Sequence, residues 1–185
     1  TTTKIWKVQK RLDKVINYAT NKEKTKNNYN EYEFNNINQV INYATNPDKT
    51  EKQFYTTGIN CEVKNADKQM QFVKILYGKE KGMLAFHAYQ SFDEGEVTPK
   101  IAHEIGVKLA NEMWGDRFQV VVSTHLNTRH LHNHFVINSV SFKDGKKYYS
   151  NLTNTALLRK TSDEICEEYG LSVLKEKTCK SGINF

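Results

Sequence analysis

The sequence contains little cysteine and little proline, and it lacks any long run of apolar residues. Its 185 residues include two prolines and three cysteines, Cys61, Cys166 and Cys179. Because these cysteines are odd in number and widely spaced, they fit neither a disulfide framework nor a zinc ribbon, and they indicate a reducing compartment. No apolar stretch approaches the roughly 20 residues of a membrane-spanning helix. The first residues, TTTKIWKVQKRLDK, are too polar for a signal peptide.

Positive charge exceeds negative charge along the chain. The formal net charge is +6 and the isoelectric point is about 9.1. Such a balance favours a polyanionic partner, of which nucleic acid is the most common. The length suits one domain with a single core, and no linker divides the sequence.

Hydrophobic periodicity predicts an α+β fold built on an antiparallel sheet with helices packed on one face. A polar, asparagine-rich loop is expected at 26–36. The predicted strands are 3–8, 54–61, 83–92, 118–125 and 132–142, and the predicted helices are 11–20, 37–45, 65–77, 98–113 and 153–169.

The segment VINYATN occurs twice, at 15–21 and again at 40–46, and each copy lies in a predicted short helix. The second copy ends at Asn46-Pro47, since a residue before proline disfavours helical geometry. Each copy carries one tyrosine, Tyr18 or Tyr43. A tyrosine in such a helix can pack against its neighbours or act as a nucleophile, so the rest of the sequence must decide.

Four histidines gather within ten residues, in the stretch HLNTRHLHNH. His132 and His134 alternate on a predicted strand, so both imidazoles point to the same face. A hairpin through the preceding strand would bring His125 beside His132, whereas His130 falls in the turn. Three converging imidazoles leave coordination positions open, as catalytic metal sites do. The residues alone do not choose the metal, because imidazole suits zinc, copper, iron and nickel, and manganese or magnesium can serve phosphoryl transfer.

Several motifs resemble those of relaxases, the mobilisation nucleases of the HUH endonuclease superfamily. They occur in order along nearly the whole chain: Tyr-x-x-Asn-Pro-Asp-Lys-Thr, TGINC, AFHAYQSF, IAHEIGVKLANEMWG and THLNTRHLHNHFVINSVSF. The sequence is similar above all to relaxases of integrative conjugative elements and plasmids of Gram-positive bacteria. Because such relaxases are commonly longer, the resemblance implies a nuclease domain at 1–174 and a basic, loose tail at 175–185 of a longer protein.

The resemblance implies nicking and rejoining of one DNA strand at an origin of transfer, which initiates conjugation. A tyrosine would attack the scissile phosphate and stay covalently attached to the 5′ phosphate. His125, His132 and His134 would hold a divalent cation, with manganese or magnesium expected ahead of zinc, cobalt or nickel. Asn127 departs from the pattern, since many relatives carry an aspartate there. That departure puts in doubt the support of a ligand by a neighbouring carboxylate.

Spacing favours Tyr43 over Tyr18 as the nucleophile. Tyr43 lies 17 residues before Asn60 of TGINC, whereas Tyr18 lies 42 residues before it. Tyr18, however, follows the first strand closely, as the nucleophile of a relaxase does. Attack by a histidine is a third alternative.

Further candidates accompany these residues. We expect His87, Asn138 and Glu104 to support the active site, and Lys24, Lys49 and Thr50 to bind DNA phosphates. The expected partners are single-stranded and hairpin DNA, accessory relaxosome proteins and a secretion-system coupling protein, with no membrane contact. A monomer is expected in the bacterial cytoplasm, carried to the recipient cell on DNA. A rolling-circle replication initiator and a non-catalytic metal-containing DNA-binding domain are the alternatives.

Overall fold

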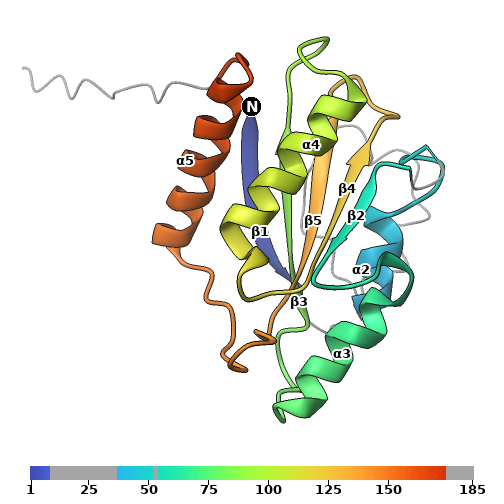
Figure 1. Ribbon diagram of the computed structural model, residues 1–185, viewed down its shortest axis with the longest axis vertical. Coiled ribbons are helices and arrows are strands. Elements are labelled where there is room, and N and C mark those ends of the chain that lie inside the picture. The colour runs from blue at the N-terminus through green and yellow to red at the C-terminus, as the bar shows by residue number, and fades with distance from the viewer. Residues whose placement is uncertain (9–36, 52–53, 174–185) are drawn as a thin grey trace, which may run out of the picture.

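A five-stranded antiparallel sheet forms the centre of the molecule in this computed structural model, which describes residues 1–8, 37–51 and 54–173. The strands lie in the order β1-β3-β5-β4-β2, and each neighbouring pair is antiparallel. Figure 1 shows the strands side by side in this order, with α4 passing in front of them. The strand bounds are Thr2–Val8 (β1), Thr56–Ile59 (β2), Ala85–Ser91 (β3), Val120–His125 (β4) and His132–Asn138 (β5).

The helices begin and end where the sequence provides caps. Thr98 accepts a hydrogen bond from the Ile101 amide with Pro99 next in the chain, and Asn151 caps the last helix in the same way. Gly170, at φ +72°, terminates that last helix in the left-handed region. The helix bounds are Ile37–Ala44 (α2), Ala66–Leu76 (α3), Pro99–Ala110 (α4) and Leu152–Glu168 (α5), with a 3-10 turn at Val63–Asn65 (η2) and a π-helical turn at Asn111–Gly115 (η3).

Helices cover both faces of the sheet. On one face α4 and α5 bury Phe86, Val122 and Phe135, and α4 lies across the strands in Figure 1. On the other face α2 and α3 pack over Val121 and Val136. The predicted α+β class and antiparallel sheet are confirmed, but the helices do not lie on one face alone. The reason is that the central strands present apolar side chains to both sides, so each side needs a cover.

Most predicted elements match the structure to within a few residues. The strand predicted at 132–142 ends at Asn138, because the chain turns back through Gly145, whose φ is +65°, and Ser141 bonds Lys146. The predicted helix at 11–20, the loop at 26–36 and the tail at 175–185 lie outside the described residues. Within the described ranges, no helix is both long and apolar enough to cross a membrane.

Candidate active site

Three imidazoles meet where strands β4 and β5 form a hairpin. His125 is directly opposite His132 in the antiparallel ladder, and His134 points to the same face two residues further on. The ring centroids lie 5.1 Å (His125–His132), 4.2 Å (His125–His134) and 4.9 Å (His132–His134) apart. One nitrogen from each ring lies within 4.8 Å of the others. The convergence expected from strand alternation is therefore present.

Each of the three imidazoles has one nitrogen held by a neighbour. His125 Nε2 donates to the Ala44 carbonyl at 2.7 Å, and His132 Nδ1 donates to the His130 carbonyl at 3.0 Å. His134 Nδ1 lies 2.8 Å from His87 Nε2. The other nitrogen of His134, Nε2, is buried and has no hydrogen-bond partner in the described part of the chain.

These features fit a metal ion. A buried ring nitrogen without a hydrogen-bond partner is costly unless something else binds it. Imidazole is the commonest protein ligand for divalent transition metals, and three such ligands leave positions for a substrate. His125, His132 and His134 are the residues that would hold the ion.

Burial keeps these histidines neutral, which is the form that binds metal. Desolvation lowers the pKa of His125 to about 4, and the nearby His132 and Lys49 lower it too. Complete burial, followed by the influence of His125 and His132, lowers the pKa of His87 to about 3. Burial also lowers the pKa of His132, and it brings that of His134 well below the ordinary value. The imidazoles are thus in the ligand form at neutral pH.

Helix α2 places Tyr43 over the cluster. Its ring centroid lies 6.1 Å from that of His87, 6.0 Å from that of His125 and 5.6 Å from that of His134. The following residue, Ala44, ends the helix, and its carbonyl accepts hydrogen bonds from both His125 and the Ser123 hydroxyl, the latter at 2.6 Å. Two strand side chains therefore fix the helix end that carries the tyrosine.

The end of α2 also contributes to the electrostatics of the site. A helix carries partial negative charge at its C-terminus, which stabilises a nearby cation. No basic residue occupies the last turn of α2. Lys49 follows in the next turn of the chain, and its ammonium lies 4.8 Å from the Tyr43 ring centroid. Lys49 thus adjoins the tyrosine, as a residue expected to bind phosphate would.

Other predicted site residues lie elsewhere. Asn138 shares the histidine face, but it is buried against Lys74, the Met70 carbonyl and Gln119. Glu104 is exposed on α4, across the sheet from the cluster, where it pairs with Lys100. It was expected near the ligands, but the helix that carries it covers the opposite face.

The residues expected to bind DNA phosphates also lie in different places. Thr50 is fully buried and donates its hydroxyl to the Asn46 carbonyl at 2.9 Å, so it is not placed to bind a phosphate. Tyr18 and Lys24 lie outside the described residues. The sequence did not point to the Ala44 and His130 carbonyls that hold two imidazoles, because backbone acceptors leave no mark on residue identity.

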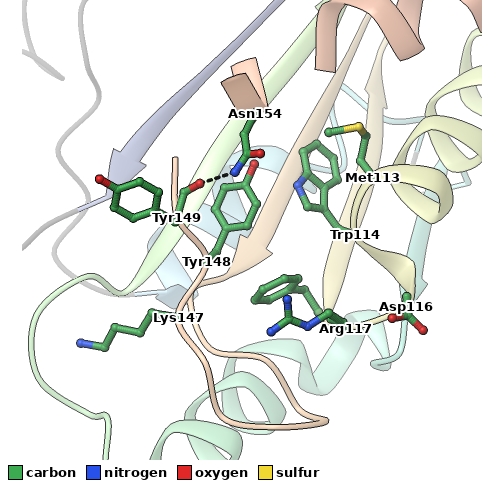
Figure 2. A pocket seen from close by; sticks show the side chains of 9 residues that line it. Met113, Trp114, Asp116, Arg117, Lys147, Tyr148, Tyr149 and Asn154 are labelled. Atoms are coloured by element: carbon green, nitrogen blue, oxygen red, sulfur yellow. Dashed lines mark hydrogen bonds between the residues drawn. The ribbon is translucent and has the colours of Figure 1, made fainter. Parts of the chain in front are cut away.

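A hollow of about 260 Å³ lies away from the histidines. Figure 2 shows the aromatic rings of Trp114, Tyr148 and Tyr149 around it, with Asn154 hydrogen-bonded to the Tyr149 carbonyl. Its residues come from η3, the chain after β5 and the start of α5. It contains none of the residues of the candidate active site.

The fold and the site define a nuclease domain of the relaxase class. Residues 43–171 match the MobA/VirD2-like relaxase family over its nuclease domain. This match covers more than half of the chain, so the chain belongs to that family.

Named relatives agree with this assignment. The chain is 44% identical over 124 residues to protein rlx of Staphylococcus aureus, which covers 67% of this chain and 39% of that protein. It is 28% identical over 123 residues to the group II intron-interrupted relaxase LtrB of Lactococcus lactis subsp. cremoris, which covers 58% of this chain and 22% of that protein. The chain therefore spans about two fifths or less of the length of these relatives.

A solved structure from work on the molecular basis of vancomycin resistance transfer in Staphylococcus aureus has a similar fold. The TM-score is 0.57, over 93% of this chain and 95% of that chain. The sequence identity is 12%, so the likeness shows the fold alone.

Proposed function

We propose that this domain nicks and rejoins one DNA strand at an origin of transfer, through a covalent bond between Tyr43 and the 5′ phosphate. The observation that carries the proposal is the position of Tyr43, whose ring lies 5.6 Å from that of His134 within a three-histidine cluster. A nuclease that used water would need no tyrosine there, and it could not reseal the strand.

The proposed reaction exchanges one phosphate ester for another. The Tyr43 oxygen forms a bond to phosphorus, the bond from phosphorus to the 3′ oxygen breaks, and the phenolic proton is lost while the 3′ oxygen gains one. The bond energy is kept in the phosphotyrosyl ester, so attack by a 3′ hydroxyl reverses the step. A divalent cation held by His125, His132 and His134 would offset the charge that develops on the phosphate oxygens.

Lys49 supports this step from the protein side. A phenol is a weak nucleophile until it loses its proton, and a nearby ammonium stabilises the resulting anion. Lys49 lies at a suitable position, 4.8 Å from the ring centroid of Tyr43. It also adjoins the place where a scissile phosphate would approach Tyr43.

The wider role follows as part of the same proposal. The substrates would be single-stranded and hairpin DNA at the origin of transfer, with accessory relaxosome proteins and a coupling protein as partners. The reaction would start in the cytoplasm of the donor bacterium, and the protein would reach the recipient on the transferred strand. Manganese or magnesium is the proposed metal, with zinc, cobalt and nickel as competitors, because imidazole ligands accommodate all three.

The decisive experiment traps the covalent adduct. A labelled single strand from the origin of the element that encodes the protein is incubated with the protein and each metal in turn, and adducts are separated by denaturing electrophoresis. We expect Tyr43→Phe to abolish the adduct, and we expect Tyr18→Phe, the matched control in the other VINYATN copy, to retain it.

Three outcomes would overturn parts of this proposal. An intact adduct in Tyr43→Phe together with its loss in Tyr18→Phe would assign the nucleophile to the first copy. An adduct that survives both substitutions and is lost in acid would indicate a phosphohistidine. Tight binding without cleavage in any metal would identify a non-catalytic DNA-binding domain.

A further inference from the structure

The three clustered imidazoles differ in what their anchoring partners can do. His125 and His132 each bond a backbone carbonyl, which can only accept. The proton of each ring is therefore assigned, to Nε2 in His125 and to Nδ1 in His132. The anchor of His134 is the imidazole of His87, which can either accept or donate. His132 Nδ1 also lies 3.1 Å from the Thr128 hydroxyl, but its carbonyl partner already assigns its proton. Among these three rings, His134 is therefore the one whose proton position depends on another side chain.

His87 lies beside the cluster, on the same face of the sheet. It lies on β3, next to β5, and its side chain is completely buried. The two ring centroids lie 4.9 Å apart with their planes inclined by 29°, and His87 Nε2 lies 2.8 Å from His134 Nδ1. It has no exposed surface, so its contacts are with neighbouring groups of the protein. What it does contact is a candidate metal ligand.

Two arrangements of the proton between these rings have opposite consequences. If His87 Nε2 accepts, His134 carries its proton on Nδ1, and the lone pair of Nε2 faces the cluster. If His87 Nε2 donates, the proton of His134 sits on Nε2, and that ring cannot bind a cation. The buried Nε2 of His134, without a partner in the described structure, is the atom that this choice controls.

We infer that His87 is a positioning residue that holds His134 in its Nδ1-protonated form and thereby makes Nε2 a metal ligand. The inference rests on the proposed role of the cluster as a metal site. Ligating histidines are usually oriented by a carboxylate, a carbonyl or water. Here an imidazole takes that place.

The first test measures the tautomer directly. Two-bond proton–nitrogen correlation spectra of the metal-free wild-type protein, labelled with nitrogen-15 in histidine, distinguish Nδ1–H from Nε2–H rings. His134→Gln assigns the signals. We expect His134 as the Nδ1–H tautomer, and His87→Leu should convert it to a mixture. A wild-type protein with His134 protonated on Nε2 would overturn the inference.

The second test measures the affinity for Mn²⁺ alone by calorimetry, without DNA. We expect His87→Leu to weaken binding by about 10–100-fold, the usual cost of losing a partner of a metal ligand. His87→Gln offers a carbonyl oxygen that accepts from Nδ1–H, so its affinity should stay within about threefold of wild type. Wild-type affinity in His87→Leu would overturn the inference.

The matched control is a histidine on the other face of the sheet. His103 bonds Thr57 at 2.8 Å and Thr124 at 2.9 Å, and it touches none of the three clustered rings. His103→Leu should leave Mn²⁺ affinity unchanged, whereas an equal loss in both leucine variants would mean that His87 acts only through general stability. If His87→Leu does not fold, the wild-type tautomer and the His87→Gln affinity still decide.

These results are separable from the proposed function. If Mn²⁺ affinity changes as expected in the His87 variants but neither they nor the wild type cleave DNA, the positioning role stands and the nuclease proposal fails. If the wild type forms the covalent adduct while Mn²⁺ affinity is the same in the His87→Leu variant, the nuclease proposal stands and the positioning role fails.

Discussion

The two faces of the central sheet are built from the same strands, yet the histidines on them differ in their hydrogen bonding. On the α4 face, His103 bonds Thr57 and Thr124, so both of its ring nitrogens have partners. On the α2 face, His134 is more deeply buried than His103, but its Nε2 has no partner in the described structure. An unsatisfied nitrogen on a buried ring beside two other imidazoles is a position at which a ligand is expected.

The polar groups around Asn133 on the α4 face form a closed network. The Asn133 amide donates to Gln90 and to the Ala102 carbonyl, and it accepts from Thr124. Such a network holds a helix against a sheet without offering any atom to a ligand. The comparison teaches that a buried histidine is informative only when its partners are known.

The largest expected effect separates the two faces by activity. His134→Gln should lower the rate of metal-dependent cleavage by about 10³-fold, because loss of a metal ligand removes several kcal/mol of transition-state stabilisation. His103→Gln should retain cleavage while losing stability. Single-turnover nicking assays with thermal unfolding of both variants check this, and equal loss of cleavage in both would erase the distinction.

The next largest effect is expected at Lys74, which bonds Asn138 on the histidine face. Lys74 is completely buried, and burial lowers its pKa from 10.5 to about 7. Its folded pKa is depressed, so the penalty for burying its charge is present in full below pH 7 and fades as pH rises toward 10.5. Lys74→Met should therefore raise the free energy of unfolding at pH 6 by a few kcal/mol. This figure is roughly the free energy equivalent to the pKa shift, minus the contribution of the hydrogen bond that Lys74 loses.

Urea unfolding at pH 6 and pH 9.5 measures this difference. The gain from Lys74→Met should be clearly smaller at pH 9.5. Lys68→Met, an exposed position on the same helix, should show no such dependence. A gain that is constant with pH would mean that Lys74 does not titrate in this range.

A smaller effect is expected where α4 meets the sheet. A Cβ atom at Gly106 would lie 2.5 Å from Asn133 Nδ2, inside contact distance. Gly106→Ala should destabilise the fold by about 1–3 kcal/mol, because the closed network has no room to shift. Lys100→Ala on the exposed side of α4 is the control. Chemical denaturation compares the two, and equal stability would show that the helix can move away.

The smallest effect tests how α2 is held over the cluster. Ser123 donates to the Ala44 carbonyl at 2.6 Å, the same atom that His125 bonds. Ser123→Ala removes one of two anchors, so stability should fall by about 1 kcal/mol. Adduct formation should slow severalfold because Tyr43 is less well oriented. An unchanged rate would show that His125 alone is a sufficient anchor.

The parts of the site that depend on neighbouring residues were predictable from the sequence. Strand alternation and a six-residue connection placed His125 opposite His132, and the ladder has that register. The helix that carries Tyr43 was also expected, because its apolar spacing and the Asn46-Pro47 stop are local signals. Glu104 was misplaced because a helical pattern does not tell which side of a sheet the helix will cover.

What the sequence by itself determined is the set of local elements, the histidine face and the family to which the chain belongs. The elements and the histidine face follow from side-chain periodicity, which acts over a few residues, and the family follows from the order of motifs along the chain. The tertiary structure decided what distant segments do to one another: the Ala44 carbonyl that fixes the Tyr43 helix on β4, the burial of Thr50, and the pairing of His87 with His134. Two copies of VINYATN have the same local preferences, so only packing against the sheet could place Tyr43 beside the imidazoles.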